Sequence, residues 1–492
     1  MCKRVGITIK MKSKMMMITT ETILAAISSC PPSPRLDPAP GLCQKGAMKM
    51  MPLFLTALLG GTVASSAKDY LLHTFKKTQL SDKFWCEGAT FGDLNRDGKP
   101  DLISGPYWYA GPDFKTRHEY DSAQSRKAVA GVAPFKRKNA DGQEESIEGF
   151  EGALGVDNKY SDNFFAFVHD VNKDGWNHIL IIGFPGEATA WFENPKGADG
   201  HWARHVVFDV TENESPTFTD LTGDGKPELV CSSKGFYGYA EPDWKNPSEP
   251  WKFHPLSPDN KYQRFTHGMG VGDVNGDGRL DLLEKNGWWE QPKSLAGDPV
   301  WAFHKFEFAK LGGAQMYAYD VNGDGRNDVI TSVAAHGFGL VWYEQLRTGD
   351  EITFQQHVIL SPEQKRVPDR YGVCFSELHA LDLVDMDGDG LKDIVTGKRF
   401  WSHGRTGDPD RNSAAVLYWF KLVRGADHSA EFVPYLIDDS SGVGTQIVAA
   451  ECSNPKYPDI VVGNKRGTFY FQHEARKVGK SEWDRAQPKP VD

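Results

Sequence analysis

The sequence has no long uninterrupted apolar run, few cysteines and no excess of positive charge. No stretch is long enough to cross a membrane as a helix of the mature protein. The 56 Lys and Arg face 66 Asp and Glu, a net charge of −10, which argues against nucleic acid as a partner. Seven cysteines in 492 residues exclude a disulfide-dense scaffold. No Ser-His-Asp, Cys-His or zinc-type spacing appears either.

Glycine and aromatic residues, in contrast, are abundant. The 50 Gly and 14 Trp favour a β-rich fold with many tight turns, in which aromatic rings pack on pleated faces. The four cysteines that follow residue 67, at positions 86, 231, 374 and 452, fall in separate segments and are expected to be partly buried thiols.

The N-terminal region resembles an export signal preceded by patternless sequence. Lys49 provides a positive start, Leu53–Val63 an apolar stretch, and residues 65–67 a small-residue cleavage site, so residues 48–67 are expected to be a signal peptide. Residues 1–47 are then an extension that belongs to no domain, with Met48 as the true start. The alternative is an N-terminal membrane anchor with a cytoplasmic tail. Without residues 1–67 the net charge is −16, and the mature protein is expected to be secreted or periplasmic.

An acidic motif, Asp-x-Asn/Asp-x-Asp-Gly-x-x-Asp, recurs along the chain. Six copies occur, with small variations, in FGDLNRDGKPDLI from Phe91, VHDVNKDGWNHIL from Val168, FTDLTGDGKPELV from Phe218, VGDVNGDGRLDLL from Val271, AYDVNGDGRNDVI from Ala318 and LVDMDGDGLKDIV from Leu383. A seventh segment, AAECSNPKYPDIVVG from Ala449, keeps the frame but loses the central acids. Such self-similarity indicates a repeat architecture rather than several unrelated domains.

Each copy of the motif is followed by a similar series of strands. A β-branched strand comes first, then an aromatic one such as AWFENP at Ala190, then one like RHVVF at Arg204. This order predicts an all-β, seven-bladed β-propeller of four-stranded antiparallel blades over residues 68–475, with a polar tail over 476–492. The segment YLLHTF at Tyr70 matches the last strand of a blade, so we expect it to complete the seventh blade and close the ring.

These repeats resemble the FG-GAP/VCBS repeats of integrin alpha subunits and of many secreted bacterial proteins. The resemblance covers Tyr70 to about His473, and six copies in register make it specific. It implies the same propeller fold, with calcium-type loops within the blades.

The acidic loops are expected to bind calcium as a structural cofactor. Calcium takes six to eight oxygen ligands, and alternate residues of a short loop supply them. The expected ligands are Asp93, Asn95, Asp97, Asp101, Asp170, Asn172, Asp174, Asp220, Thr222, Asp224, Glu228, Asp273, Asn275, Asp277, Asp281, Asp320, Asn322, Asp324, Asp328, Asp385, Asp387, Asp389 and Asp393. The second loop has His178 at the last ligand position, a poor ligand for calcium, and is expected to be weak or empty. The seventh should bind nothing. Hairpins that need no metal are the alternative.

The rim opposite the metal loops is predicted to carry the functional site. Entrances to the first strands and exits from the second strands are rich there in His, Lys, Arg and aromatics. The candidate catalytic residues are His267, His379, His403, Arg399 and Lys285. The candidate ligand-binding residues are Trp85, Glu87, Arg264, Lys234, Asn286, His336, Glu377, Lys398, Trp401 and Lys465. Because rim residues bury little apolar surface, replacing His267, His379 or Arg399 is expected to leave stability nearly unchanged.

Three insertions, Lys115–Phe150, Ser361–Tyr371 and His403–Ala414, are expected beside this rim, where loops shape a site. Arginine binds carboxylates and aromatic rings stack on sugars, so the first interpretation is a calcium-binding propeller that binds a glycan or a protein in its central funnel.

The alternative is a carbon–oxygen lyase or dehydratase that acts on an acidic or keto-sugar glycan, with a His or Tyr base and a cation that holds the enolate. The segment AWFENPKGADGHWARHVVF resembles repeats of a fungal aldos-2-ulose dehydratase, whose dehydratase domain is a seven-bladed propeller.

Overall fold

The computed structural model describes residues 70–122, 135–138, 144–147, 160–403, 408–410 and 413–491. These residues form 29 strands and one short helix, α1 (Lys480–Ala486), which confirms the all-β fold class. The chain divides into Met1–Ser66 and Ala67–Asp492, and all that follows concerns the second part. The predicted extension and signal peptide lie outside the described residues, as does most of the first insertion. In the described part of the chain, no helix has the length and apolar character that a membrane crossing requires.

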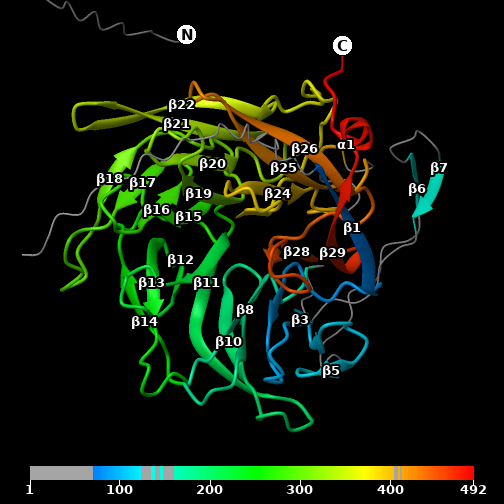
Figure 1. The fold of residues 1–492 in the computed structure, drawn as a ribbon. Helices are drawn as coiled ribbons and strands as arrows, with labels where there is room; N and C mark the ends of the chain where they lie inside the picture. Colours follow the sequence, from blue (N-terminus) through cyan, green and yellow to red (C-terminus); the bar gives the residue numbers. More distant parts are fainter. Residues whose placement is uncertain are drawn as a thin grey trace, which may run out of the picture. The chain divides into compact units, whose positions relative to one another are not determined.

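Apart from one separate hairpin, the described strands group into seven antiparallel units of four, numbered here in chain order (Figure 1). Unit one is β2 (Ala89–Gly92), β3 (Asp101–Ser104), β4 (Tyr107–Tyr109) and β5 (Arg117–Glu119). Unit two is β8 (Phe165–His169), β9 (His178–Ile182), β10 (Glu187–Glu193) and the first part of β11 (Ala203–Thr219). Unit three is the rest of β11 with β12 (Glu228–Ser233), β13 (Phe236–Glu241) and β14 (Lys252–Pro255). Unit four is β15 (Met269–Gly272), β16 (Asp281–Glu284), β17 (Gly287–Glu290) and β18 (Ala302–Lys305); unit five is β19 (Gln315–Tyr319), β20 (Asp328–Ser332), β21 (Leu340–Thr348) and β22 (Glu351–Leu360).

Units six and seven complete the series. Unit six is β23 (Leu381–Val384), β24 (Asp393–Gly397), β25 (Leu417–Arg424) and β26 (Ala430–Asp438); unit seven is β27 (Ile447–Ala450), β28 (Asp459–Asn464), β29 (Gly467–Val478) and β1 (Tyr70–Ser81). The separate hairpin, β6 (Phe135–Lys138) with β7 (Glu144–Ile147), belongs to the insertion after Lys115. Each acidic loop therefore joins the first and second strands of its unit.

First strands of successive units lie against one another, except in units two and three, which share strand β11. Contacts join β2 to β8, β11 to β15, β15 to β19, β19 to β23, β23 to β27, and β27 back to β2. Between units four and five the approach becomes a parallel pairing of β15 with β19. A Cβ on Gly270 would lie only 1.8 Å from the carbonyl oxygen of Met316, so this approach requires glycine.

The two ends of the described chain meet in unit seven. Strand β1 pairs antiparallel with β29, from Tyr70 opposite Val478 to Ser81 opposite Thr468, as the sequence predicts. A strand edge that would otherwise expose unpaired backbone groups is thereby covered. Within the predicted polar tail, β29 continues to Val478 and α1 follows, with Trp483 packed against Tyr70 at a ring distance of 5.5 Å.

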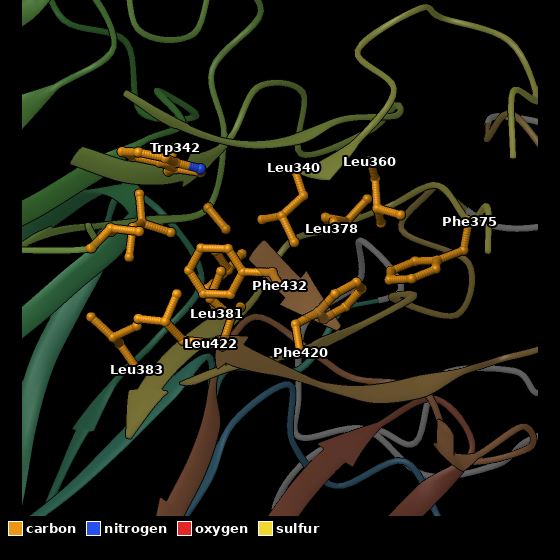
Figure 2. Close-up of a cluster of buried hydrophobic side chains, with 14 residues drawn as sticks. Leu340, Trp342, Leu360, Phe375, Leu378, Leu381, Leu383, Phe420, Leu422 and Phe432 are labelled. Atoms are coloured by element: carbon orange, nitrogen blue, oxygen red, sulfur yellow. The ribbon is translucent and has the colours of Figure 1, made fainter. Parts of the chain in front are cut away.

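The hydrophobic core lies mainly between neighbouring units. Figure 2 shows one cluster that units five and six share. It includes Leu340, Trp342 and Leu360 from unit five and Leu381, Leu383, Phe420, Leu422 and Phe432 from unit six. Burying each such side chain contributes about 1.5–3 kcal/mol, so the units stabilise one another.

Candidate functional site

Ionisable side chains from six of the seven units, together with Tyr160 before unit two, meet in one place, called here the polar cluster. Its described members are Glu87 from unit one, Tyr160 before unit two, Glu214 from unit three, His267 from unit four, His336 from unit five, Glu377, His379, Lys398, Arg399, His403 and Asp408 from unit six, and Lys465 from unit seven. The cluster thus joins residues more than 300 positions apart in the sequence.

The repeat register explains why these side chains converge. One residue six positions before the first Asp of a loop joins the cluster in four units: Glu87, Glu214, His267 and His379. Arg399 and Lys465 each stand six positions after the last Asp of their loop, Asp393 and Asp459. Equivalent positions lie at the same end of equivalent strands, opposite the acidic loops.

A buried ion-pair network forms the inner end of the cluster. The Arg399 guanidinium contacts Glu87 Oε1 at 3.0 Å and Oε2 at 3.1 Å, and Glu214 Oε2 at 3.6 Å. Lys465 Nζ donates to the carbonyl oxygen of Trp401 at 2.8 Å and lies 3.6 Å from Glu87. Burial alone would lower the pKa of Arg399, but the two glutamates outweigh it and raise that pKa.

This burial corrects one expectation from the sequence. Arg399 is buried, and so is His379, so neither is an exposed rim residue. Removing one charge from a buried network leaves its partner uncompensated. Replacing Arg399 is therefore expected to reduce stability substantially.

Four histidine rings form a chain from the surface into the interior. The exposed fraction of the side chain falls from 45% at His403 to 33% at His336, 11% at His267 and 1% at His379. Ring centroids lie 4.0 Å apart for His336–His403, 4.3 Å for His336–His379 and 4.7 Å for His267–His336. Burial and neighbouring positive charges lower the pKa of His336 to about 3, and that of His379 well below its usual value. The rings of His336 and His379 are therefore neutral near pH 7.

The outer end of the cluster carries an oriented histidine. Asp408 accepts hydrogen bonds from the backbone N of His403 at 3.0 Å and from its Nδ1 at 2.9 Å. The proton is therefore placed on Nδ1, which leaves Nε2 able to accept one. Beside it, Ser402 donates to Glu377 at 2.5 Å, and burial raises the pKa of Glu377 to about 8.

Of the fifteen predicted catalytic and ligand-binding residues, nine are members of the polar cluster: Glu87, His267, His336, Glu377, His379, Lys398, Arg399, His403 and Lys465. Trp401 contributes its carbonyl oxygen, which accepts a hydrogen bond from Lys465. Its ring is buried and stacks on Phe400 at 4.8 Å, so it cannot offer a face to a sugar, contrary to expectation.

Five predicted residues have their described contacts elsewhere. Lys234 forms an exposed ion pair with Asp209, and Asn286 hydrogen-bonds Glu284. Arg264 donates to the carbonyl oxygen of Pro185. The remaining two show backbone contacts or local packing: the carbonyl of Lys285 accepts from Phe308 and Ala309, and Trp85 packs edge-on against Tyr107.

Three cluster members were missed by the sequence reasoning. Glu214 lies at the same register position as Glu87, so counting back six residues from each first Asp would have found it. Tyr160 donates to the carbonyl oxygen of Ser402 at 2.6 Å, and no repeat position marks it. Asp408 lies in an insertion, where register gives no guide.

The acidic loops have the donor groups that calcium requires. In the sixth loop, Asp385, Asp387 and Asp393 each offer a carboxylate oxygen within 4.8 Å of the others', as do Asp220, Asp224 and Glu228 in the third. Lys421 also contacts Asp387, and lies 2.7 Å from Asp389, so its ammonium competes for the same oxygens. The residues fit a hard cation, with a built-in competitor in the sixth loop.

The second loop uses a histidine N–H where the others have a carboxylate. The backbone N of Asn194 donates to His178 Nδ1 at 2.9 Å, so the proton lies on Nε2, 2.9 Å from Asn172 Oδ1. The same nitrogen is 3.8 Å from both Asp170 and Asp174. An N–H thus points at the oxygens that would bind a cation.

Comparison with protein-family models and with curated proteins gives no match. Among solved structures, an Agrocybe aegerita lectin described as recognising non-reducing terminal N-acetylglucosamine is 14% identical, with a TM-score of 0.39 over 81% of this chain and 97% of its own. The rhamnogalacturonan lyase YesW is 12% identical, with a TM-score of 0.37 over 82% and 72%. BBS1N, from its complex with ARL6DN, is 10% identical, with a TM-score of 0.40 over 84% and 98%. These TM-scores are too low to carry any of those activities over to this chain.

Proposed function

We propose that the chain is a seven-bladed β-propeller in which each four-stranded unit is one blade. The convergence of the first and last units on one polar cluster supports this proposal. An open row of seven units would keep units one and seven far apart, yet Glu87 of unit one contacts Lys465 of unit seven. A closed ring needs no capping repeats, because its ends cover each other.

We infer further that the polar cluster is the catalytic centre of a carbon–oxygen lyase or dehydratase. The observation that carries this inference is the His403–Asp408 pair at the half-exposed mouth of a buried, charged cluster. In an elimination, His403 Nε2 would take the proton from the carbon next to a carboxylate or ketone. The electrons of the carbon–hydrogen bond then form a carbon–carbon double bond, the carbon–oxygen bond breaks, and the leaving oxygen takes up the proton that His403 Nε2 has accepted. The substrate class is a carbohydrate with a carboxylate or keto group.

The remaining cluster residues suit the other requirements of this reaction. Arg399 and Lys465 hold positive charge on the buried side of the histidines, and this charge would stabilise an enolate that forms beside His403. An oriented base typically contributes about 10²–10⁴-fold to the rate.

Binding of a glycan or protein without catalysis is the second candidate. An exposed stack outside the cluster favours it, in which the Arg264 guanidinium lies 5.3 Å from the ring of Phe184 and 5.0 Å from that of Phe265. Phe265 is an exposed aromatic, and its ring offers a face on which a sugar could stack.

Export and structural calcium complete the proposal. The apolar segment before residue 67 supports a secreted or periplasmic location, and the oxygen donors of the acidic loops support calcium. Calcium would hold the loop ends of the blades, opposite the catalytic centre.

The test of catalysis uses a panel of uronate-containing polysaccharides and keto sugars, with ultraviolet absorbance as the readout of the new double bond. Wild type should produce absorbance, and His403→Gln should reduce the rate by about 10²–10⁴-fold. His357→Gln is the matched control, because His357 pairs with Glu344 at 2.8 Å on β22, outside the cluster. Ligand binding by wild type without any absorbance would contradict the lyase and support the binding module.

A further inference from the structure

We infer that His267, His336 and His379 bind a divalent transition-metal ion in the polar cluster, with Glu214 as a further ligand. The inference deepens the proposed function, because the ion would lie in the same centre. Metal binding can nevertheless be measured without a carbohydrate, so the two proposals can fail separately.

The three rings approach one another from three directions. Each offers a ring nitrogen within 4.8 Å of the other two. Their planes make angles of 72°, 74° and 74° with one another, so the rings do not stack. They come from units four, five and six, whose packing holds them in place. Three imidazoles arranged around a common point are a donor set that proteins use to bind a metal ion.

Glu214 lies as close to two of the rings as a further metal ligand would lie. Its Oε2 is 3.3 Å from His267 Nε2 and 3.8 Å from His379 Nε2. Metal–nitrogen bonds of about 2.0–2.1 Å in a tetrahedral site place two ligands roughly 3.3 Å apart. The carboxylate and the two imidazoles are therefore spaced as ligands of one ion would be.

Unpartnered nitrogens provide an independent observation. His379 Nε2, His267 Nε2 and His336 Nδ1 are all buried and have no hydrogen-bond partner among the described residues. His379 is almost fully buried, and a buried polar atom without a partner is costly. An ion bound between the rings would satisfy these nitrogens.

The ligand chemistry separates this site from the acidic loops. Imidazole ligands suit zinc, copper, iron and nickel, whereas calcium prefers hard oxygen ligands. An ion held by these four ligands could take the carboxylate or keto oxygen of the substrate as a fifth ligand and act as a Lewis acid.

The experiment loads the site with cobalt. The full chain is stripped with a chelator, saturated with calcium to fill the loops, and titrated with Co²⁺, followed by visible absorption. We expect one equivalent of bound cobalt with an absorption band from nitrogen coordination, displaced by one equivalent of Zn²⁺. His267→Gln and His336→Gln should each weaken binding by more than the roughly 10–100-fold that an outer-shell partner contributes. His357→Gln should change nothing, and circular dichroism verifies folding.

The outcomes separate the possibilities. A folded wild type without the band, or a band that survives in both His variants, overturns the inference. Loss of binding in His403→Gln but not in His267→Gln would place the ion at His336, His403 and Asp408 instead, and would also overturn it. Cobalt binding as expected, with no elimination activity on any panel substrate, would keep the metal site and refute the lyase.

Discussion

At the residue scale, the charges of the polar cluster depend on one another. Arg399 forms ion pairs with both Glu87 and Glu214, and Glu87 also pairs with Lys465. Burial alone would raise the pKa of Glu214, but His267 and Arg399 outweigh it and lower that pKa to about 2. A carboxylate that stays ionised when buried does so because its neighbours are positive.

Replacing Arg399 should therefore destabilise the protein. Arg399→Met is expected to lower the free energy of unfolding by about 3–5 kcal/mol, because two glutamates are left buried without their partner. Urea denaturation measures the change. Lys234→Met is the control, since the exposed Lys234–Asp209 pair should be worth no more than about 1 kcal/mol. Equal, small losses in both variants would mean that the network contributes nothing to stability.

At the scale of elements, the contact between β1 and β29 carries a pair of histidines. His73 Nδ1 lies 2.9 Å from His473 Nε2, and His473 Nδ1 lies 3.1 Å from the carbonyl oxygen of Pro458. His473 therefore donates from Nδ1 and accepts at Nε2, and a second proton would set two N–H groups against each other. Burial lowers the pKa of each histidine to about 4.

This pair predicts a loss of stability in acid. Because the pKa is lower in the folded than in the unfolded chain, the stabilisation is complete above about pH 6.5 and is lost as the pH falls toward 4. For the buried His473 the loss amounts to about 3 kcal/mol at 1.36 kcal/mol per pKa unit. Melting temperatures between pH 7.5 and 4.5 measure it. His73→Gln/His473→Gln should fall less steeply than wild type, and parallel curves would show that other groups cause the acid loss.

At the scale of the whole molecule, the proposed propeller has metal loops at one end and the polar cluster at the other. The hydrophobic core between units connects the two ends, so the stability of each unit depends on that of its neighbours. Stabilising the loops should therefore stabilise the ring.

Calcium should raise the melting temperature and a chelator should lower it. A site filled at a hundredfold excess over its Kd adds about 2.7 kcal/mol. Calorimetry with EDTA and then with calcium measures the change, and four to six ions per chain are expected. Asp385→Asn should reduce the response, whereas Asp174→Asn should not, because an N–H of His178 already points at the oxygens of the second loop. A melting temperature that does not change with calcium would mean that the acidic loops are turns that bind no metal.

The repeat pattern was sufficient to predict the repeating part of this protein. Periodic loops, strands and register specified the all-β class, the pairing of the segment at Tyr70 with the last unit, and most of the polar cluster, because equivalent positions in a repeat occupy equivalent places. The roles of those side chains depend on how the units pack together. The tertiary structure buried Arg399 between two glutamates, turned the ring of Trp401 into the interior, and brought Asp408 to His403. These outcomes depend on packing between units far apart in the chain, which local pattern does not encode.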